Sequence, residues 1–231
     1  MRRPAAFSKI WWQESGLTAM LVFLCLAIFV GLPLETLGIV NSSTVGVIVT
    51  FLFVSGVVAM AGRGRVTILV ALAAIASLAV RWLSEVFPGR RMAIWDLVLG
   101  MVALALLTAF VLHHVFREGP VTADKIRGAI LAYMLLGLFW CVAYQLVDLL
   151  DPTSFRFPGP RTMASSHLSH DLAYYSFITL TTVGYGDITP VQPYARALAM
   201  IEALIGQLYP AILIARLVSL QIASRPVGGS K

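Results

Sequence analysis

Six long apolar stretches, separated by short polar segments, constrain the fold of this chain more than any other feature. A helix that crosses a hydrocarbon core about 30 Å thick needs about 20 mostly apolar residues. Because 59% of the 231 residues are hydrophobic and only 12% are charged, the chain lacks the charged surface of a soluble domain. The sequence therefore predicts an all-α integral membrane protein. The six expected spans are 16–34, 37–61, 66–83, 92–116, 126–150 and 196–223.

A shorter apolar segment, 170–180, lies between the fifth and sixth stretches. It is too short to cross a membrane, and short hydrophobic segments of this kind form re-entrant elements. The segment 117–125 separates the fourth stretch from the fifth. Gly119 and Pro120 end one helix there, and Thr122 is a suitable N-cap for the next.

These features divide the chain into five expected regions. They are a cytoplasmic N-terminus at 1–15, a four-helix transmembrane domain at 16–116, a cytoplasmic linker at 117–125, a second transmembrane domain at 126–223 and a cytoplasmic tail at 224–231. The loops on the side of both termini hold more Lys and Arg than the opposite loops, which indicates a multi-pass protein of the cell membrane with cytoplasmic termini. The net charge of +6 is spread over these loops, so the sequence does not favour a nucleic acid partner. The outer loop, 151–167, is rich in Pro, Gly and Ser, which predicts an irregular, exposed segment.

The segment after the short apolar stretch has the composition of an ion-binding loop. Rings of backbone carbonyls can replace the water around a potassium ion. Successive carbonyls face one axis when the backbone alternates between right- and left-handed conformations, which Gly184 and Gly186 allow at little cost. Thr182 can add its hydroxyl, whereas Val183 and Tyr185 would point away from the axis and brace the loop. The negative end of the preceding short helix would also favour a cation below the loop.

The run Thr182-Val183-Gly184-Tyr185-Gly186, followed by Asp187 and Pro190, resembles the selectivity filter of the potassium channels. The resemblance covers about 125–220. It implies an outer helix at 126–150, a re-entrant pore helix at 170–180 and an inner helix at 196–223. It also implies potassium ions bound at Thr182, Val183, Gly184 and Tyr185, passive conduction without catalysis, no other cofactor, and a homotetramer in membrane lipid, since one chain supplies one filter strand. Gly206 falls at the family's inner-helix hinge, and Pro210 lies four residues further on, so these two residues are the expected gating hinge.

The sequence departs from the family pattern behind the filter. Ile178 stands where some members carry a glutamate that pairs with the aspartate matching Asp187. We expect Asp187 to hydrogen-bond Tyr174 or Tyr175 instead. Glu202 is the acid buried in this half of the chain, and it either braces the filter or pairs with a nearby hydroxyl. The residues expected to support the filter are Thr181, Asp187, Tyr174, Tyr175 and Glu202.

The front half lacks the arginine repeat of voltage-sensing relatives. The fourth stretch carries Asp96 but no Lys or Arg before Arg117, and Asp96 is expected to pair with Arg81, Arg90 or Arg91. The histidine pairs His113–His114 and His167–His170 are either pH sensors or interfacial polar residues.

Three alternatives to a selective channel stay open: a less selective cation channel, a potassium-coupled transporter and a non-conducting regulatory subunit of a channel assembly. The intact run disfavours the first. A transporter built on pore-type repeats would carry several filter segments in one chain, whereas this chain carries one complete copy.

Overall fold

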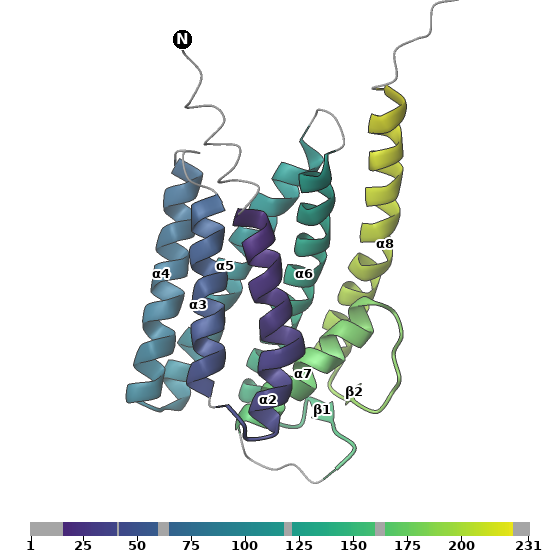
Figure 1. Cartoon of the computed structure of the whole chain (residues 1–231). Coiled ribbons are helices and arrows are strands. Elements are labelled where there is room, and N and C mark those ends of the chain that lie inside the picture. The colour runs from purple at the N-terminus through teal and green to yellow at the C-terminus, as the bar shows by residue number, and fades with distance from the viewer. Residues whose placement is uncertain (1–15, 41, 60–64, 118–121, 160–164, 224–231) are drawn as a thin grey trace, which may run out of the picture.

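The computed structural model describes residues 16–40, 42–59, 65–117, 122–159 and 165–223, and these form a bundle of long helices (Figure 1). The predictions for the N-terminus at 1–15 and the tail at 224–231 lie outside the described residues. Residues 16–25 are helical and continue into the π-helix η1 (Leu26–Gly31) and α2 (Leu32–Thr36). The remaining elements are α3 (Ser42–Ala59), α4 (Arg65–Val86), α5 (Arg90–Phe116), α6 (Ala123–Leu150), β1 (Phe155–Arg156), α7 (Ser165–Leu180), β2 (Thr189–Pro190) and α8 (Pro193–Ala223).

Within the described residues, five helices are long and apolar enough to cross a membrane. They are Gly16–Glu35, Thr67–Ser84, Arg90–Phe116, Ala123–Leu150 and Pro193–Ser219. The prediction of an all-α integral membrane protein is therefore confirmed. The second expected span corresponds to α3, which has 18 residues and a shorter apolar section at Gly46–Val58.

The turn before α3 shows why the second helix begins later than the expected position 37. Gly38 has a φ of 69°, a left-handed conformation that ends the preceding helix. The amide of Ile39 donates to the carbonyl of Leu34 at 3.0 Å, which closes the helix end. Upstream, Pro33 at the start of α2 has no backbone N–H to donate to the preceding turn. The residues before it form the π-helix η1, and the Leu32 amide at its end donates a hydrogen bond to the Ala27 carbonyl.

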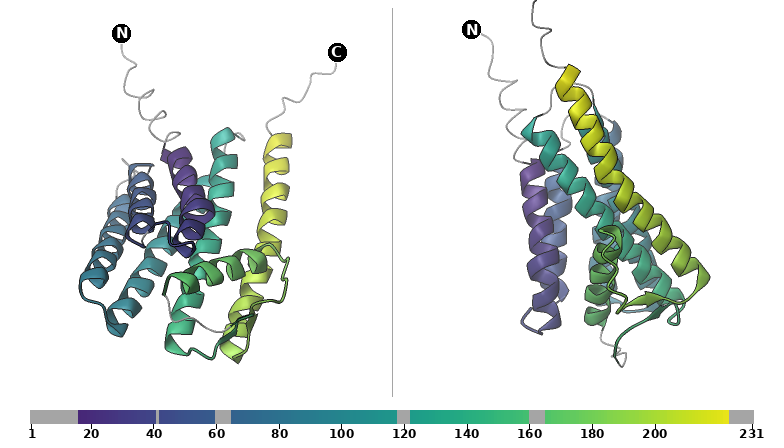
Figure 2. Two further views of the ribbon diagram at one scale, coloured as in Figure 1. Left: turned by 60° about the horizontal axis from the view of Figure 1, so that its bottom comes forward. Right: turned by 90° about the vertical axis from the view of Figure 1, so that its right-hand side faces the viewer.

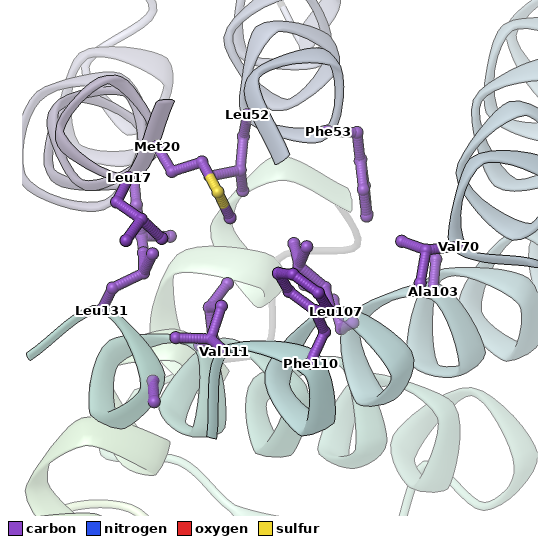
Figure 3. Close-up of a cluster of buried hydrophobic side chains, with 14 of the residues drawn as sticks. Leu17, Met20, Leu52, Phe53, Val70, Ala103, Leu107, Phe110, Val111 and Leu131 are labelled. Atoms are coloured by element: carbon purple, nitrogen blue, oxygen red, sulfur yellow. The ribbon is translucent and has the colours of Figure 1, made fainter. Parts of the chain in front are cut away.

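The main apolar core gathers around α5 (Figure 3). Side chains from the first helix, α3, α4 and α6 converge on one side of α5. The labelled residues of this cluster are Leu17, Met20, Leu52, Phe53, Val70, Ala103, Leu107, Phe110, Val111 and Leu131. The four front helices therefore pack against α6 of the same chain, through α5.

The start of α6 follows from local sequence. Thr122 accepts a hydrogen bond from the Lys125 amide at 3.4 Å, and Asp124 lies in the first turn. This confirms the predicted N-cap.

The helices α7 and α8 follow α6 and complete the bundle (Figure 2). With 16 residues, α7 is about 24 Å long and too short to cross a membrane. It begins at Ser165, so the expected start at His170 was wrong by one and a half helical turns. α8 lies at the edge of the bundle, and only 11% of its most apolar stretch is buried, against 44% for α6. The N-terminal end of the first helix and the C-terminal end of α8 lie on the same side of the bundle (Figure 1).

Candidate functional site

The loop that follows α7 has an alternating backbone. Thr182, Gly184 and Gly186 have φ values of 59°, 53° and 80°, whereas the intervening Val183 and Tyr185 are not in the positive region. This is the alternation that allows successive carbonyls to face one side. Thr182 is the non-glycine residue with positive φ in the described part of the chain, and an L-residue adopts this conformation at a cost of about 1–2 kcal/mol. The sequence predicted the two glycines but carried no signal for Thr182.

The end of α7 fixes where this loop begins. The amides of Val183 and Gly184 both donate to the Ile178 carbonyl, at 2.9 and 3.1 Å. The Thr182 amide donates to the Thr179 carbonyl at 2.9 Å. These bonds satisfy carbonyls that a helix end would otherwise leave without partners. Any displacement of α7 is therefore passed directly to the loop.

Three helices meet at the last carbonyl of α7. The Tyr133 hydroxyl of α6 donates to the Leu180 carbonyl at 3.0 Å. From α8, Gly206 lies so close that a Cβ at this position would be 1.8 Å from the same oxygen. Tyr133 also stacks on Tyr209, with 5.5 Å between ring centroids, and the Tyr209 hydroxyl donates to the Ala129 carbonyl at 2.8 Å. Gly206 is thus required for the close approach of α8 to α7.

A buried polar network joins the same three helices. The Tyr144 hydroxyl of α6 lies 2.5 Å from Oε2 of Glu202 in α8. The Ser176 hydroxyl of α7 lies 2.6 Å from Oε1 of Glu202 and 2.8 Å from the Gly137 carbonyl of α6. The side chains of all three residues are fully buried. Of the two sequence-based readings of Glu202, the structure contains the one in which it pairs with nearby hydroxyls, and both hydroxyls come from other helices.

Aromatic rings enclose this network. Tyr144 contacts Tyr175 and Phe155 edge to face, with centroid distances of 5.0 and 5.5 Å, and it stacks on Trp140 at 6.2 Å. Phe155 lies in β1, which pairs with β2 in the register Phe155 to Pro190. The expectation that 151–167 is wholly irregular and exposed was therefore wrong, because Phe155 is buried among these rings.

Hydrogen bonds tie the C-terminal end of α6 to the start of α8. The Tyr194 hydroxyl donates to Asp151, and the hydroxyl and amide of Thr153 donate to the same carboxylate at 2.7 and 2.9 Å. These bonds, that of Tyr194 first, hold the pKa of Asp151 below its ordinary value. The Val191 amide also donates to the Ser154 carbonyl at 2.8 Å.

The remaining predicted site residues are placed as follows. Tyr174 hydrogen-bonds Asp187, whereas Tyr175 belongs to the aromatic cluster. The Thr181 hydroxyl donates back to the Phe177 carbonyl of α7 at 2.7 Å. Val183 and Tyr185 are 52% and 72% exposed in the single chain. Pro210 lies inside α8, where it removes the helical bond to the Gly206 carbonyl.

The front half forms an ion pair and two hydrogen bonds in the N-terminal part of α5. Asp96 pairs with Arg81 of α4 at 4.0 Å. Arg90, at the start of α5, donates to the Leu149 and Leu150 carbonyls at the end of α6, each at 3.3 Å. A cation here complements the negative end of the α6 dipole. His113 and His114 lie in the last turn of α5.

The sequence profile of the ion channel family matches residues 156–222, which contain α7, the loop and α8 except for its last residue. Protein LctB of Bacillus caldotenax is 31% identical over 125 residues, which cover 52% of this chain and 92% of that protein. Protein LctB of Geobacillus stearothermophilus is 44% identical over 87 residues, 37% of this chain and 62% of that protein. Two pore potassium channel c of Oryza sativa subsp. japonica is 33% identical over 92 residues, 39% of this chain and 17% of that protein. No solved structure gives a significant match.

Proposed function

Since the chain belongs to the potassium channel family, we propose that it forms a potassium-selective pore and conducts potassium ions passively, without catalysis. The observation that carries this proposal is the alternating backbone at Thr182, Gly184 and Gly186, directly after a helix too short to cross the membrane. In the proposed pore, the carbonyls of Thr182, Val183, Gly184 and Tyr185 replace the hydration shell of potassium ions. No cofactor beyond the permeant ion takes part.

The proposed pore contains four copies of the chain, because a ring of carbonyls around one axis needs several equivalent strands and each chain supplies one. The exposure of Tyr185 and Val183 in the single chain supports this assembly, since a tetramer would cover these side chains. The shallow burial of α8 supports it as well, since this helix would line the pore and contact its neighbours. We place the multi-pass subunit in the cell membrane with both termini in the cytoplasm and the filter near the outer face.

Potassium flux into liposomes tests the proposal. Purified protein reconstituted in vesicles should carry potassium and rubidium well, and sodium and lithium poorly, and barium should block the flux. Gly184→Ala is the matched control. No atom outside its chain neighbours lies within 4 Å of a Cβ at this position, so the subunit should still fold and insert. However, the positive φ becomes strained by about 1–2 kcal/mol, and the added methyl group should stop conduction.

Each alternative predicts a different result in the same vesicles. Equal reversal potentials for sodium and potassium would identify a less selective cation channel. Flux that requires a second ion gradient would identify a potassium-coupled transporter. A well-folded protein with no flux under any gradient would identify a non-conducting subunit.

A further inference from the structure

We infer that Glu202 is held as a neutral carboxylic acid, and that its hydrogen bonds position α7, and with it the filter, for conduction. The second part of this inference rests on the proposed function. The first part concerns only the buried network of Tyr144, Ser176, Glu202 and the Gly137 carbonyl, and it can be tested without any flux measurement.

A count of protons in the network leads to the neutral acid. Three short contacts need three protons: Tyr144 to Oε2 of Glu202, Ser176 to Oε1 of Glu202, and Ser176 to the Gly137 carbonyl. A serine or tyrosine hydroxyl carries one proton each, and a backbone carbonyl and an ionised carboxylate carry none. If Glu202 were ionised, two protons would serve three contacts, and two acceptors would face each other at 2.6 or 2.8 Å.

A protonated Glu202 supplies the third proton and orders the whole network. Its Oε1–H donates to the Ser176 hydroxyl, Ser176 donates to the Gly137 carbonyl, and Tyr144 donates to Oε2. Every polar atom then has a partner, as buried polar groups require.

The surroundings of Glu202 favour the same form. Its side chain is fully buried, and an ionised carboxylate without a compensating charge is strongly disfavoured there. The hydrogen-bond partners of the Glu202 carboxyl are the hydroxyls of Tyr144 and Ser176, and neither of these groups carries a positive charge. The neighbouring Tyr144 and Tyr175 are aromatic and neutral, so the site offers hydroxyls rather than cations.

The network acts on the filter through α7. Ser176 lies two residues before Ile178, whose carbonyl accepts the amides of Val183 and Gly184. Glu202 comes from α8 and Tyr144 from α6, so the network fixes α7 against both neighbouring helices about one helical turn before α7 ends at Leu180. Glu202 therefore acts as a positioning residue for α7.

The protonation state is tested by infrared spectroscopy of the full-length protein in vesicles. Glu202→Gln changes one carboxyl group to an amide, so the difference between wild-type and variant spectra isolates this side chain. We expect the carbonyl stretch of a protonated carboxylic acid in the wild type and its loss in the variant. The bands of an ionised carboxylate in the same difference spectrum would overturn the neutral assignment.

The positioning role is tested by potassium flux in the same vesicles. An amide can accept from Tyr144 and donate to Ser176, so Glu202→Gln should rescue the network and stay within about threefold of the wild type, whereas Glu202→Ala should lose at least about tenfold. If Glu202→Ala does not fold, Tyr144→Phe removes one hydroxyl and should lower flux by about threefold or more. Asp124→Asn is the matched control, because it makes the same chemical change to a partly exposed carboxylate that pairs with Arg127 at 3.2 Å, and it should leave flux unchanged.

The outcomes separate the two proposals. If the wild type conducts and Glu202→Gln loses as much flux as Glu202→Ala, the neutral network is contradicted. If Glu202→Ala or Tyr144→Phe keeps the full flux of the wild type, the positioning role is contradicted. An absence of potassium flux through the wild type would contradict the proposed function and the positioning role together, and the infrared result would still decide the protonation state.

Discussion

At the scale of single residues, Gly206 has a packing role that the sequence did not indicate. Its place in the inner helix and its spacing to Pro210 predicted a gating hinge. The structure adds that a Cβ at 206 would lie 1.8 Å from the Leu180 oxygen and 2.7 Å from the Leu180 carbonyl carbon. These are backbone atoms at the end of α7, where the loop at 181–187 begins, so they cannot move aside as a flexible side chain would.

We therefore expect Gly206→Ala to destabilise the protein and to reduce potassium flux. Overpacking of this kind typically lowers the free energy of unfolding by about 1–3 kcal/mol. Thermal unfolding in detergent and flux in vesicles measure the two effects. Gly100→Ala is the control, because a Cβ there meets Ser77 at an ordinary 3.8 Å and alanine is the better helix former by about 1 kcal/mol. A Gly206→Ala variant with wild-type stability and shortened open times would instead support the hinge.

At the scale of elements, long apolar stretches were predictable and their junctions were not. The apolar lengths predicted α5 and α6 to within three residues of their starts, and their ends at Phe116 and Leu150 agree. The start of α3 depends on a left-handed turn at Gly38. The pairing of β1 with β2 depends on contacts between segments that lie more than thirty residues apart in the sequence. The partners of Glu202 lie 26 and 58 residues away in the sequence, so only the packing of the three helices reveals them.

The elements of the front half also bear on voltage. Moving one elementary charge through the full membrane field is worth about 2.3 kcal/mol per 100 mV, so steep gating needs several mobile charges in each subunit. After Arg91, α5 carries no Lys or Arg before its end at Phe116. Arg81 of α4 is paired with Asp96, and Arg90 is bonded to the end of α6.

We expect the open probability to depend only weakly on voltage. A conductance–voltage curve from reconstituted protein in symmetrical potassium should be shallow or ohmic, because no helix of the described front half presents a row of unpaired basic residues to the field. A steep sigmoid with an effective gating charge of several units would be incompatible with this reading of α4 and α5.

At the scale of the whole molecule, the front four helices, α6 and α7 are parts of one packed unit. The core around α5 includes residues of the first helix, α3, α4 and α6. In turn, α6 contacts α7 through two hydrogen bonds, from the Tyr133 hydroxyl of α6 to the Leu180 carbonyl and from the Ser176 hydroxyl of α7 to the Gly137 carbonyl. The front half therefore contacts α6 of its own chain. The loop at 181–187 and most of α8 are open to contact in the single chain.

The proposed assembly of four chains around shared potassium ions predicts that removing potassium weakens the assembly. Four chains of 25.1 kDa give a protein mass of about 100 kDa, which native mass spectrometry can measure after release from detergent. A ligand that binds only the assembled state stabilises it by about 2.7 kcal/mol at a hundred times its dissociation constant.

Replacing potassium chloride by lithium chloride at equal ionic strength should therefore lower the temperature at which the tetramer dissociates. Gly184→Ala, which disturbs the proposed ion sites, should abolish the difference between the two salts. A monomer or dimer in potassium, or equal dissociation temperatures of the wild type in both salts, would show that shared potassium ions do not hold four copies of this chain together.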